Sequence, residues 1–332
     1  MKLVAPFLIF LALVVFCFFG YFWWKNALLA PSEEAQEVRF VINKGSSIET
    51  IGENLKKTGL IRNAFAFKIY LQGRGLSNRI PSGQFKIPTN LNIPDLVNLL
   101  LEGPLEVWVT IPEGLRREQY PNFFIKSFEL SSDDALSFSN DFLDLTKNNE
   151  GYLFPDTYLF SPEASVAQVV SVLTNNFNKK FKPSQGQLNS IGLTLNEVVT
   201  LASIIERETK TSKERPIVAG IYLNRIKAGW PLQADATIQY AIASFRCVDS
   251  TDVCSWWEAP LAKDKEFDSF YNTYKYKGLP PGPISNPGLT SLNAVINPQE
   301  TDYWYYIHDK NGQVYFAKTL EAHNLNIQKY LK

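Results

Sequence analysis

The feature that most constrains the fold is an uncharged stretch of about 22 residues between Lys2 and Lys25, LVAPFLIFLALVVFCFFGYFWW. As a helix rising about 1.5 Å per residue, it reaches across a bilayer core of roughly 30 Å. The aromatic cluster at its end, which includes Trp23 and Trp24, is typical of a membrane interface. We therefore predict a cytoplasmic tip and a transmembrane helix within residues 1–25, with residues 3–24 in the lipid bilayer.

A cleaved signal peptide is the alternative for this segment. Its apolar run exceeds the usual length of roughly 7 to 15 residues, and ALLAPSEE is a poor cleavage site. The count of positive charges hardly fixes the orientation, because Lys2 precedes the span and Lys25 follows it. We expect a single-pass membrane protein, with a short cytoplasmic N-terminus and its C-terminal domains outside the cytoplasm.

Composition excludes two classes of partner. Lys plus Arg and Asp plus Glu both number 33, so the chain lacks the positive charge that nucleic-acid binding requires. With three cysteines, two histidines, no C-x-x-C and no H-E-x-x-H, we expect no metal and no cofactor. Cys247 and Cys254 could form a disulfide in an oxidising compartment or remain free thiols; the sequence leaves both open.

The remaining chain divides into a linker and two α+β regions. Residues 26–37 are small, polar and acidic, as in a tether. In residues 38–105, the strand VRFVI precedes a helix capped by Ser46 and ended by Gly59, and a second extended segment precedes a helix that ends at Gly103. The pattern from Gly45 to Leu55 resembles LysM modules, and the resemblance implies binding to polymers of N-acetylglucosamine.

Residues 106–332 are predicted to form a larger α+β domain. It opens with the strand VWVTIPEGL, and ELSSDDALSF and SVAQVVSVLTNNFNKKF read as helices. Thr194 and Glu197 form the signature of a capping box at the start of a further helix. KERPIVAGIYLNRIKAG is a helix ended by Gly229, and DYWYYIHDKNGQVYF predicts a hairpin with its turn near Gly312.

The segment LASIIERETK places two glutamates on the apolar side of a helix that we predict to be amphipathic. Glutamates at such a margin commonly extend into water or pair with cations, here Arg207, Lys210 and Lys213. Residues two apart point in nearly opposite directions, so Glu206 and Glu208 cannot share a proton as a dyad.

A single carboxyl among isoleucines suits general acid catalysis. Desolvation disfavours its charged form and raises its pKa. Protonation of a glycosidic oxygen is the natural task, and hydrolases normally add a second carboxylate for it. A lytic transglycosylase needs none, because the 6-hydroxyl of the muramoyl ring attacks within the same molecule and the same carboxyl takes up the proton.

Four motifs in order carry a resemblance to a known family: EGYLFPDTYLF, LASIIERETK, VAGIYLNRIKAGWPLQADATIQYA and FYNTYKYKGLPPGPISNPG. Together they resemble the YceG-like family of endolytic murein transglycosylases over about residues 38–332. The resemblance implies cleavage of the β-1,4 bond between N-acetylmuramic acid and N-acetylglucosamine within nascent glycan strands. It also implies 1,6-anhydro ends, a role in chain termination, peptidoglycan synthases as partners, and Glu206 as the catalytic acid.

Several polar and aromatic side chains of these motifs suit contacts with a sugar strand. The candidates for substrate binding are Glu208, Asn224, Gln233, Asp235, Tyr271, Asn272, Thr273 and Tyr274. Each also has a structural interpretation, as a cap, a core residue or a backbone contact. For Glu150, Asp156 and His323 the structural interpretation is favoured.

The chain departs from the family at Phe270, where we expect proline, and at Gln313, where a histidine often follows the glycine; His308 lies nearby instead. Two alternative functions remain. In a muramidase, water attacks and a second carboxylate is required, for which Asp235 is the nearest candidate. In a non-catalytic scaffold, the domains only bind glycan near the wall-synthesis machinery.

Overall fold

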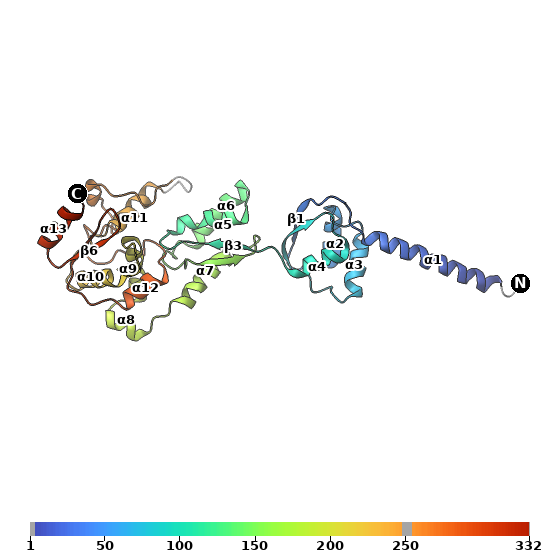
Figure 1. Ribbon diagram of the computed structural model, residues 1–332, viewed down its shortest axis with the longest axis horizontal. Helices are drawn as coiled ribbons and strands as arrows, with labels where there is room; N and C mark the ends of the chain where they lie inside the picture. The colour runs from blue at the N-terminus through green and yellow to red at the C-terminus, as the bar shows by residue number, and fades with distance from the viewer. Residues whose placement is uncertain (1–3, 248–253, 332) are drawn as a thin grey trace. The chain divides into compact units, whose positions relative to one another are not determined.

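The computed structural model describes residues 4–247 and 254–331, and it is a mixed α+β protein, as predicted (Figure 1). The chain forms two compact units. The first comprises residues 1–107 together with 159–164, and the second comprises residues 108–158 and 165–332. Every cavity described below lies within the second unit.

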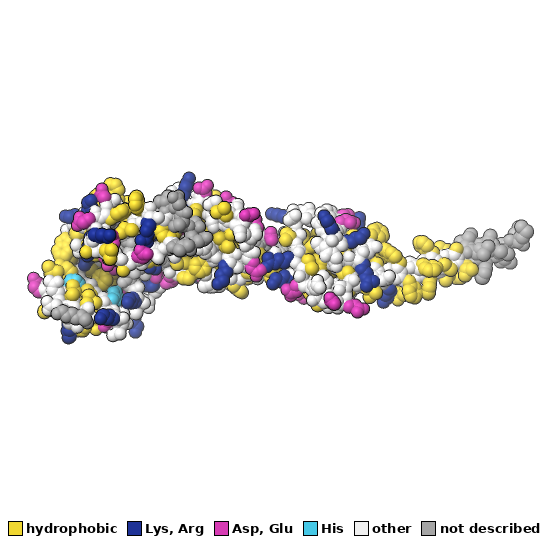
Figure 2. Space-filling view, turned by 90° about the horizontal axis from the view of Figure 1, so that it is seen from above, with side chains coloured by type: hydrophobic (Ala, Val, Ile, Leu, Met, Phe, Trp, Pro, Cys, Tyr) yellow, Lys and Arg dark blue, Asp and Glu magenta, His cyan; other side chains and the backbone are white. Residues whose placement is uncertain are grey.

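The predicted apolar helix is α1, Val4–Leu28. Its stretch Phe10–Leu28 is long and apolar enough to cross a membrane, and Figure 2 shows apolar side chains covering the face of it that is seen there. Phe16 and Phe19 are 76% and 67% exposed, whereas Ala27 at the end of the helix is buried in the first unit. The helix therefore presents apolar surface to its surroundings and joins a folded unit only at its last turn.

The first unit contains an antiparallel pair, β1 (Glu37–Ile42) and β2 (Gly83–Pro88), in the register Glu37↔Pro88 to Ile42↔Gly83. The helices are α2 (Ile48–Lys57), α3 (Ala64–Gly73) and α4 (Ile93–Glu102). The predicted cap of α2 is wrong by one residue, because Ser47, not Ser46, accepts the N–H of Thr50. Helix α3 was not predicted; its apolar residues are less regularly spaced than those of α2.

The second unit is mainly helical, with two short strands before its helical core and a hairpin near its end. The strands β3 and β4 are Val107–Thr110 and Thr157–Phe160. The predicted hairpin is confirmed, with β5 (Tyr305–His308) antiparallel to β6 (Val314–Ala317). The helices are α5 (Tyr120–Phe128), α6 (Ser132–Leu145), α7 (Val166–Lys180), α8 (Gln185–Ile191), α9 (Leu195–Glu208), α10 (Arg215–Lys227), α11 (Asp235–Arg246), α12 (Leu289–Ile296) and α13 (Leu320–Tyr330), with short 3-10 turns at Arg117–Gln119 and Ala262–Glu266.

Helix α9 is the centre of this unit and contacts α10, α11 and α12. The capping box at its start is confirmed, because Thr194 accepts the N–H of Glu197 and Glu197 accepts the N–H of Thr194. The predicted amphipathic pattern is wrong: residues 198–205 are all buried, including Thr200 and Ser203. Their hydroxyls donate to carbonyl oxygens one turn earlier in the helix, so neither hydroxyl lacks a hydrogen-bond partner when it is buried.

Cys247 and Cys254 are paired as a disulfide, with their Cα atoms 6.0 Å apart. Cys247 packs with Ala243 and Trp256 in a small apolar cluster. The pairing fixes the end of α11 to the segment that carries Trp256, which lines a cavity described below.

Candidate active site

The last turn of α9 carries Glu206 in a closed ionic cluster. One carboxylate oxygen accepts a hydrogen bond from the Arg215 guanidinium at 2.7 Å, and the other accepts from the Gly288 N–H at 3.0 Å and the Ser291 hydroxyl at 2.8 Å. Gly288 and Ser291 belong to the start of α12, so the carboxylate also lies at the positive end of that helix. Only 5% of the Glu206 side chain is exposed.

A third charged residue, Glu113, completes this cluster. Its carboxylate lies 3.7 Å from Arg215, and its side chain occupies the space where a Cβ on Gly288 would be placed. Burial raises the pKa of Glu113, and repulsion from Glu206 adds to that effect. Arg215 therefore stands between two carboxylates, and the geometry around Glu206 is that of a structural ion pair.

Glu208 lies in different surroundings. One carboxylate oxygen accepts from the Ala236 N–H at 3.1 Å, near the start of α11, and the other accepts from the Tyr306 hydroxyl at 2.9 Å. Burial raises the pKa of Glu208, although these two hydrogen bonds act in the opposite direction. The carboxyl thus holds its proton more tightly than an ordinary glutamate while it remains within reach of a cavity.

That cavity has a volume of about 560 Å³ and is formed by α9, α11, α13, the hairpin and the loop before α11. Asp235 lines it and accepts a hydrogen bond from the Tyr274 hydroxyl at 2.7 Å. Asp235 also adds to the rise in the pKa of Glu208, after the larger effect of burial. We call it the Glu208 cavity; it is lined by Glu208, Arg225, Gln233, Asp235, Lys265, Tyr274, Tyr305, Tyr306, Ile307, His308, Leu320, His323, Ile327 and Leu331.

Four of the predicted site residues meet in this cavity: Glu208, Gln233, Asp235 and Tyr274. Four do not line it, and one of these, Tyr271, lines a second cavity. Asn272 is buried and donates to the carbonyls of the 265–267 turn, Thr273 is buried and accepts the Ala234 N–H, and the Asn224 amide donates to the carbonyl of Thr301. These contacts hold the loops around the cavity in place.

The catalytic role of Glu206 stays a prediction. The two glutamates point to opposite sides, as predicted: Glu206 contacts Arg215 and the start of α12, whereas Glu208 lines the cavity. A helical wheel shows the direction of each side chain and cannot show that Arg215 and α12 close the Glu206 side. Sequence reasoning also missed Arg225, on α10, and Tyr306 and His308, for which the aromatic hairpin was the only signal.

Both histidines line the Glu208 cavity. His308 lies 3.0 Å from the buried carboxylate of Glu214, which also accepts from the Lys210 and Thr211 N–H groups. His323, for which a structural role was favoured, stacks on Tyr305 with ring centroids 5.1 Å apart. Burial lowers the pKa of His323, so the ring is held in its neutral form.

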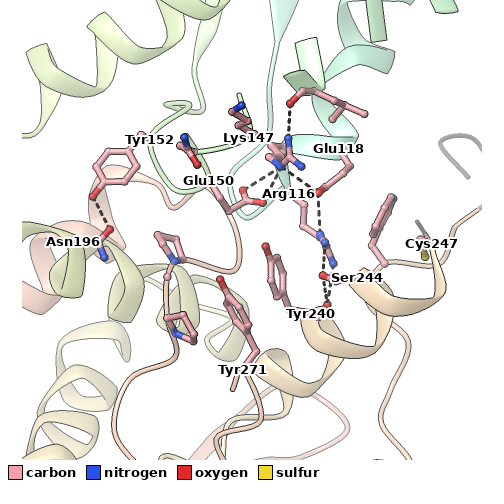
Figure 3. A pocket seen from close by; sticks show the side chains of 17 residues that line it. Arg116, Glu118, Lys147, Glu150, Tyr152, Asn196, Tyr240, Ser244, Cys247 and Tyr271 are labelled. Atoms are coloured by element: carbon pink, nitrogen blue, oxygen red, sulfur yellow. Dashed lines mark hydrogen bonds and ion pairs between the residues drawn. The ribbon is translucent and has the colours of Figure 1, made fainter. Parts of the chain in front are cut away.

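A second cavity of about 610 Å³ lies beside Glu150, and we call it the Glu150 cavity (Figure 3). Tyr271 lines this cavity and not the other one. Glu150 accepts hydrogen bonds from the Arg117 N–H at 3.1 Å and from the Asn286 amide at 2.8 Å. Burial raises its pKa to about 8.

Asp156 does not line this cavity. It accepts the Thr157 N–H and pairs with Asn176 and Lys180, which is a structural role.

Glu150 should make stability depend on pH. The folded protein keeps a proton on Glu150 up to a pH of about 8, whereas the unfolded chain releases it near a pH of about 4.5. Because the folded state then binds more protons, this group lowers the free energy of unfolding as the pH rises between those values. Glu150→Gln is expected to remove that contribution, measured by urea unfolding of both proteins at pH 5 and pH 8. An equal loss of stability in both proteins would contradict the assignment.

The chain is similar to known proteins both in sequence and in structure. The model of the YceG-like family matches residues 40–329. An endolytic murein transglycosylase of Bacillus subtilis is 30% identical over 94% of this chain and 90% of its own length. An endolytic murein transglycosylase of Streptococcus pneumoniae is 27% identical over 99% of this chain, which spans 65% of that relative.

A crystal structure of a YceG-like protein from Listeria monocytogenes is 28% identical in sequence and has a TM-score of 0.55, and the match covers 88% of this chain and 99% of that one. The match of a family model over most of the sequence agrees with this structural likeness. The chain belongs to the YceG-like family.

Proposed function

We propose that this chain is an endolytic murein transglycosylase, a lyase that cleaves the β-1,4 bond between N-acetylmuramic acid and N-acetylglucosamine within peptidoglycan strands. The names of the relatives from B. subtilis and S. pneumoniae support the reaction. The observation that carries the proposal is the enclosed carboxyl of Glu208 at the wall of a cavity large enough for sugar rings.

In the proposed mechanism, the Glu208 carboxyl donates its proton to the glycosidic oxygen as the bond from the anomeric carbon of the muramoyl ring breaks. The 6-hydroxyl of the same ring attacks that carbon and gives its proton to the carboxylate, so the acid is regenerated and no water is consumed. The Ala236 N–H and the Tyr306 hydroxyl stabilise the carboxylate while it is ionised. The neutral Tyr274 hydroxyl and the Gln233 amide face the same cavity as hydrogen-bonding groups for the sugar.

Glu206 remains the residue that the family resemblance implies as the acid. For it to act, the carboxyl would have to leave Arg215, Gly288 and Ser291, and the largely buried guanidinium would then face only the more distant carboxylate of Glu113, at 3.7 Å. We therefore propose Glu208 as the acid, with Glu206 holding the end of α9 against α10 and α12.

The mass of the product distinguishes the lyase from a muramidase. If the 6-hydroxyl attacks, each new muramoyl end is a 1,6-anhydro sugar, which is lighter by one water than a hydrolysed end. We expect anhydro ends from uncross-linked glycan strands, read by mass spectrometry. Products of the hydrolysed mass would favour the muramidase, with Asp235 activating the water; Asp235→Asn would then abolish cleavage.

We also propose a membrane location and partner proteins for this chain. The helix α1 would anchor the chain in the inner membrane as a single span, with the short N-terminus in the cytoplasm and both compact units outside it. The first unit would act as a LysM-like glycan-binding module, and peptidoglycan synthases would be partners in terminating nascent strands. A non-catalytic scaffold is the contrasting proposal, and it predicts no loss of function when Glu208 is replaced.

A further inference from the structure

The Glu150 cavity is separate from the Glu208 cavity and shares no lining residue with it, but two segments of the chain contribute residues to both. Helix α9 contributes Asn196 to one cavity and Glu208 to the other, twelve residues apart, which corresponds to about 18 Å along the helix. The loop after the second 3-10 turn contributes Tyr271 to the first and Tyr274 to the second. A polymer that fills the Glu208 cavity therefore has its neighbouring units within reach of the Glu150 cavity.

Aromatic residues form one wall of the Glu150 cavity. The rings of Tyr240 and Tyr271 have centroids 4.8 Å apart, and Figure 3 shows the two side chains next to each other, with their hydroxyls directed toward Glu150. Burial raises the pKa of both hydroxyls, so they are neutral donors at physiological pH. On the opposite side of the view, the Tyr152 hydroxyl donates to Asn196 at 3.0 Å.

The lining of the Glu150 cavity holds more positively charged than negatively charged side chains. Arg116 and Arg117 both pair with the one carboxylate of Glu118, at 3.1 and 3.4 Å. Glu150 supplies no full second negative charge, because burial raises its pKa to about 8. Lys147 is exposed on the lining and forms no ion pair within the described residues. Three cations thus face two carboxyl groups, and burial favours the neutral form of one of these, so the lining carries an excess of positive charge.

We propose that the Glu150 cavity binds a carboxylate-bearing peptide branch of the peptidoglycan strand, with Lys147 at its rim as the partner of the carboxylate. This inference rests on the proposed function, since the peptide is carried by a muramoyl unit near the bond that is cleaved. An excess of positive charge is complementary to an anion, whereas N-acetylglucosamine and a muramoyl ring whose lactyl carboxyl is in amide linkage carry no charge. The aromatic wall provides apolar surface for the peptide stem.

The test compares three forms of one glycan strand with the full-length protein in detergent: stem peptides intact, stem carboxylates amidated, and peptides removed with the freed lactyl carboxyl of each muramoyl unit amidated. The wild type is expected to show a kcat/KM roughly tenfold higher for the intact form than for the other two, the effect of one charge-assisted contact. In Lys147→Ala this ratio is expected to fall toward one, and Lys147→Arg should restore it. Lys179→Ala, at an exposed lysine of α7 outside the cavity, is the matched control and should keep the wild-type ratio.

Equal ratios in the wild type and Lys147→Ala would overturn the proposal, as would a wild type that cleaves all three forms equally well. The latter result would favour uncharged sugar rings as the occupant. Binding of a soluble disaccharide-peptide by calorimetry provides a readout that needs no cleavage. If no strand is cleaved at all, the proposed function fails, and loss of this binding in Lys147→Ala still decides the role of the cavity.

Discussion

Glu208→Gln is expected to reduce cleavage of glycan strands by a factor of about 10² to 10⁴, the usual contribution of a general acid. Glutamine keeps the shape of the side chain; its amide oxygen can accept from the Ala236 N–H, and its NH2 group can donate to the Tyr306 hydroxyl oxygen. The proton for the glycosidic oxygen is lost, whereas the fold should remain. The measurement is the rate at which anhydro ends appear, with circular dichroism and thermal unfolding to verify the structure.

Glu206→Gln is the matched control, because it makes the same chemical change two residues away on the same helix. Below its unfolding temperature, this variant should keep most of the activity. The reverse pattern, with Glu208→Gln active and Glu206→Gln folded but inactive, would return the acid to Glu206. If the wild type and both variants bind glycan strands but none of them cleaves the strands, the chain acts as a glycan-binding scaffold.

Local signals predicted the elements around the site well. The capping box of Thr194 and Glu197 depends on residues three apart, and the hairpin depends on alternating aromatic residues around Gly312. Both features are determined by neighbouring residues, so they form whichever segments pack against them. The same is true of α1, whose length and lack of charge identify it without any tertiary contact.

The assignment of the two glutamates could not be made from such signals. Their surroundings come from segments distant in the chain: Ser291 from α12 for Glu206, and Tyr306 from β5, about a hundred positions away, for Glu208. Likewise, Thr200 and Ser203 have polar side chains of a kind that usually faces water, yet Ser203 is buried and its hydroxyl accepts a hydrogen bond from the Ile284 N–H. Short polar side chains that bond to backbone can be buried, so a polar stripe on a helix does not by itself indicate water.

Glu206→Gln should lower the free energy of unfolding by about 3 kcal/mol, because it removes one partner of a buried ion pair. Glutamine can still accept from Gly288 and Ser291, but the Arg215 guanidinium, with 11% of its side chain exposed, loses its carboxylate at 2.7 Å. Urea unfolding at pH 7 measures the change.

Glu113→Gln provides the internal comparison for this loss. Glu113 faces the same guanidinium at 3.7 Å, but its side chain is 45% exposed, so water screens the contact and the expected loss is under about 1 kcal/mol. Combining Glu206→Gln with Arg215→Met removes both members of the pair, and most of the loss should be recovered because no unpaired charge remains buried. Additive losses in the double variant would mean that the two side chains stabilise the protein separately, and the case for Glu206 as a structural residue would then lose its main support.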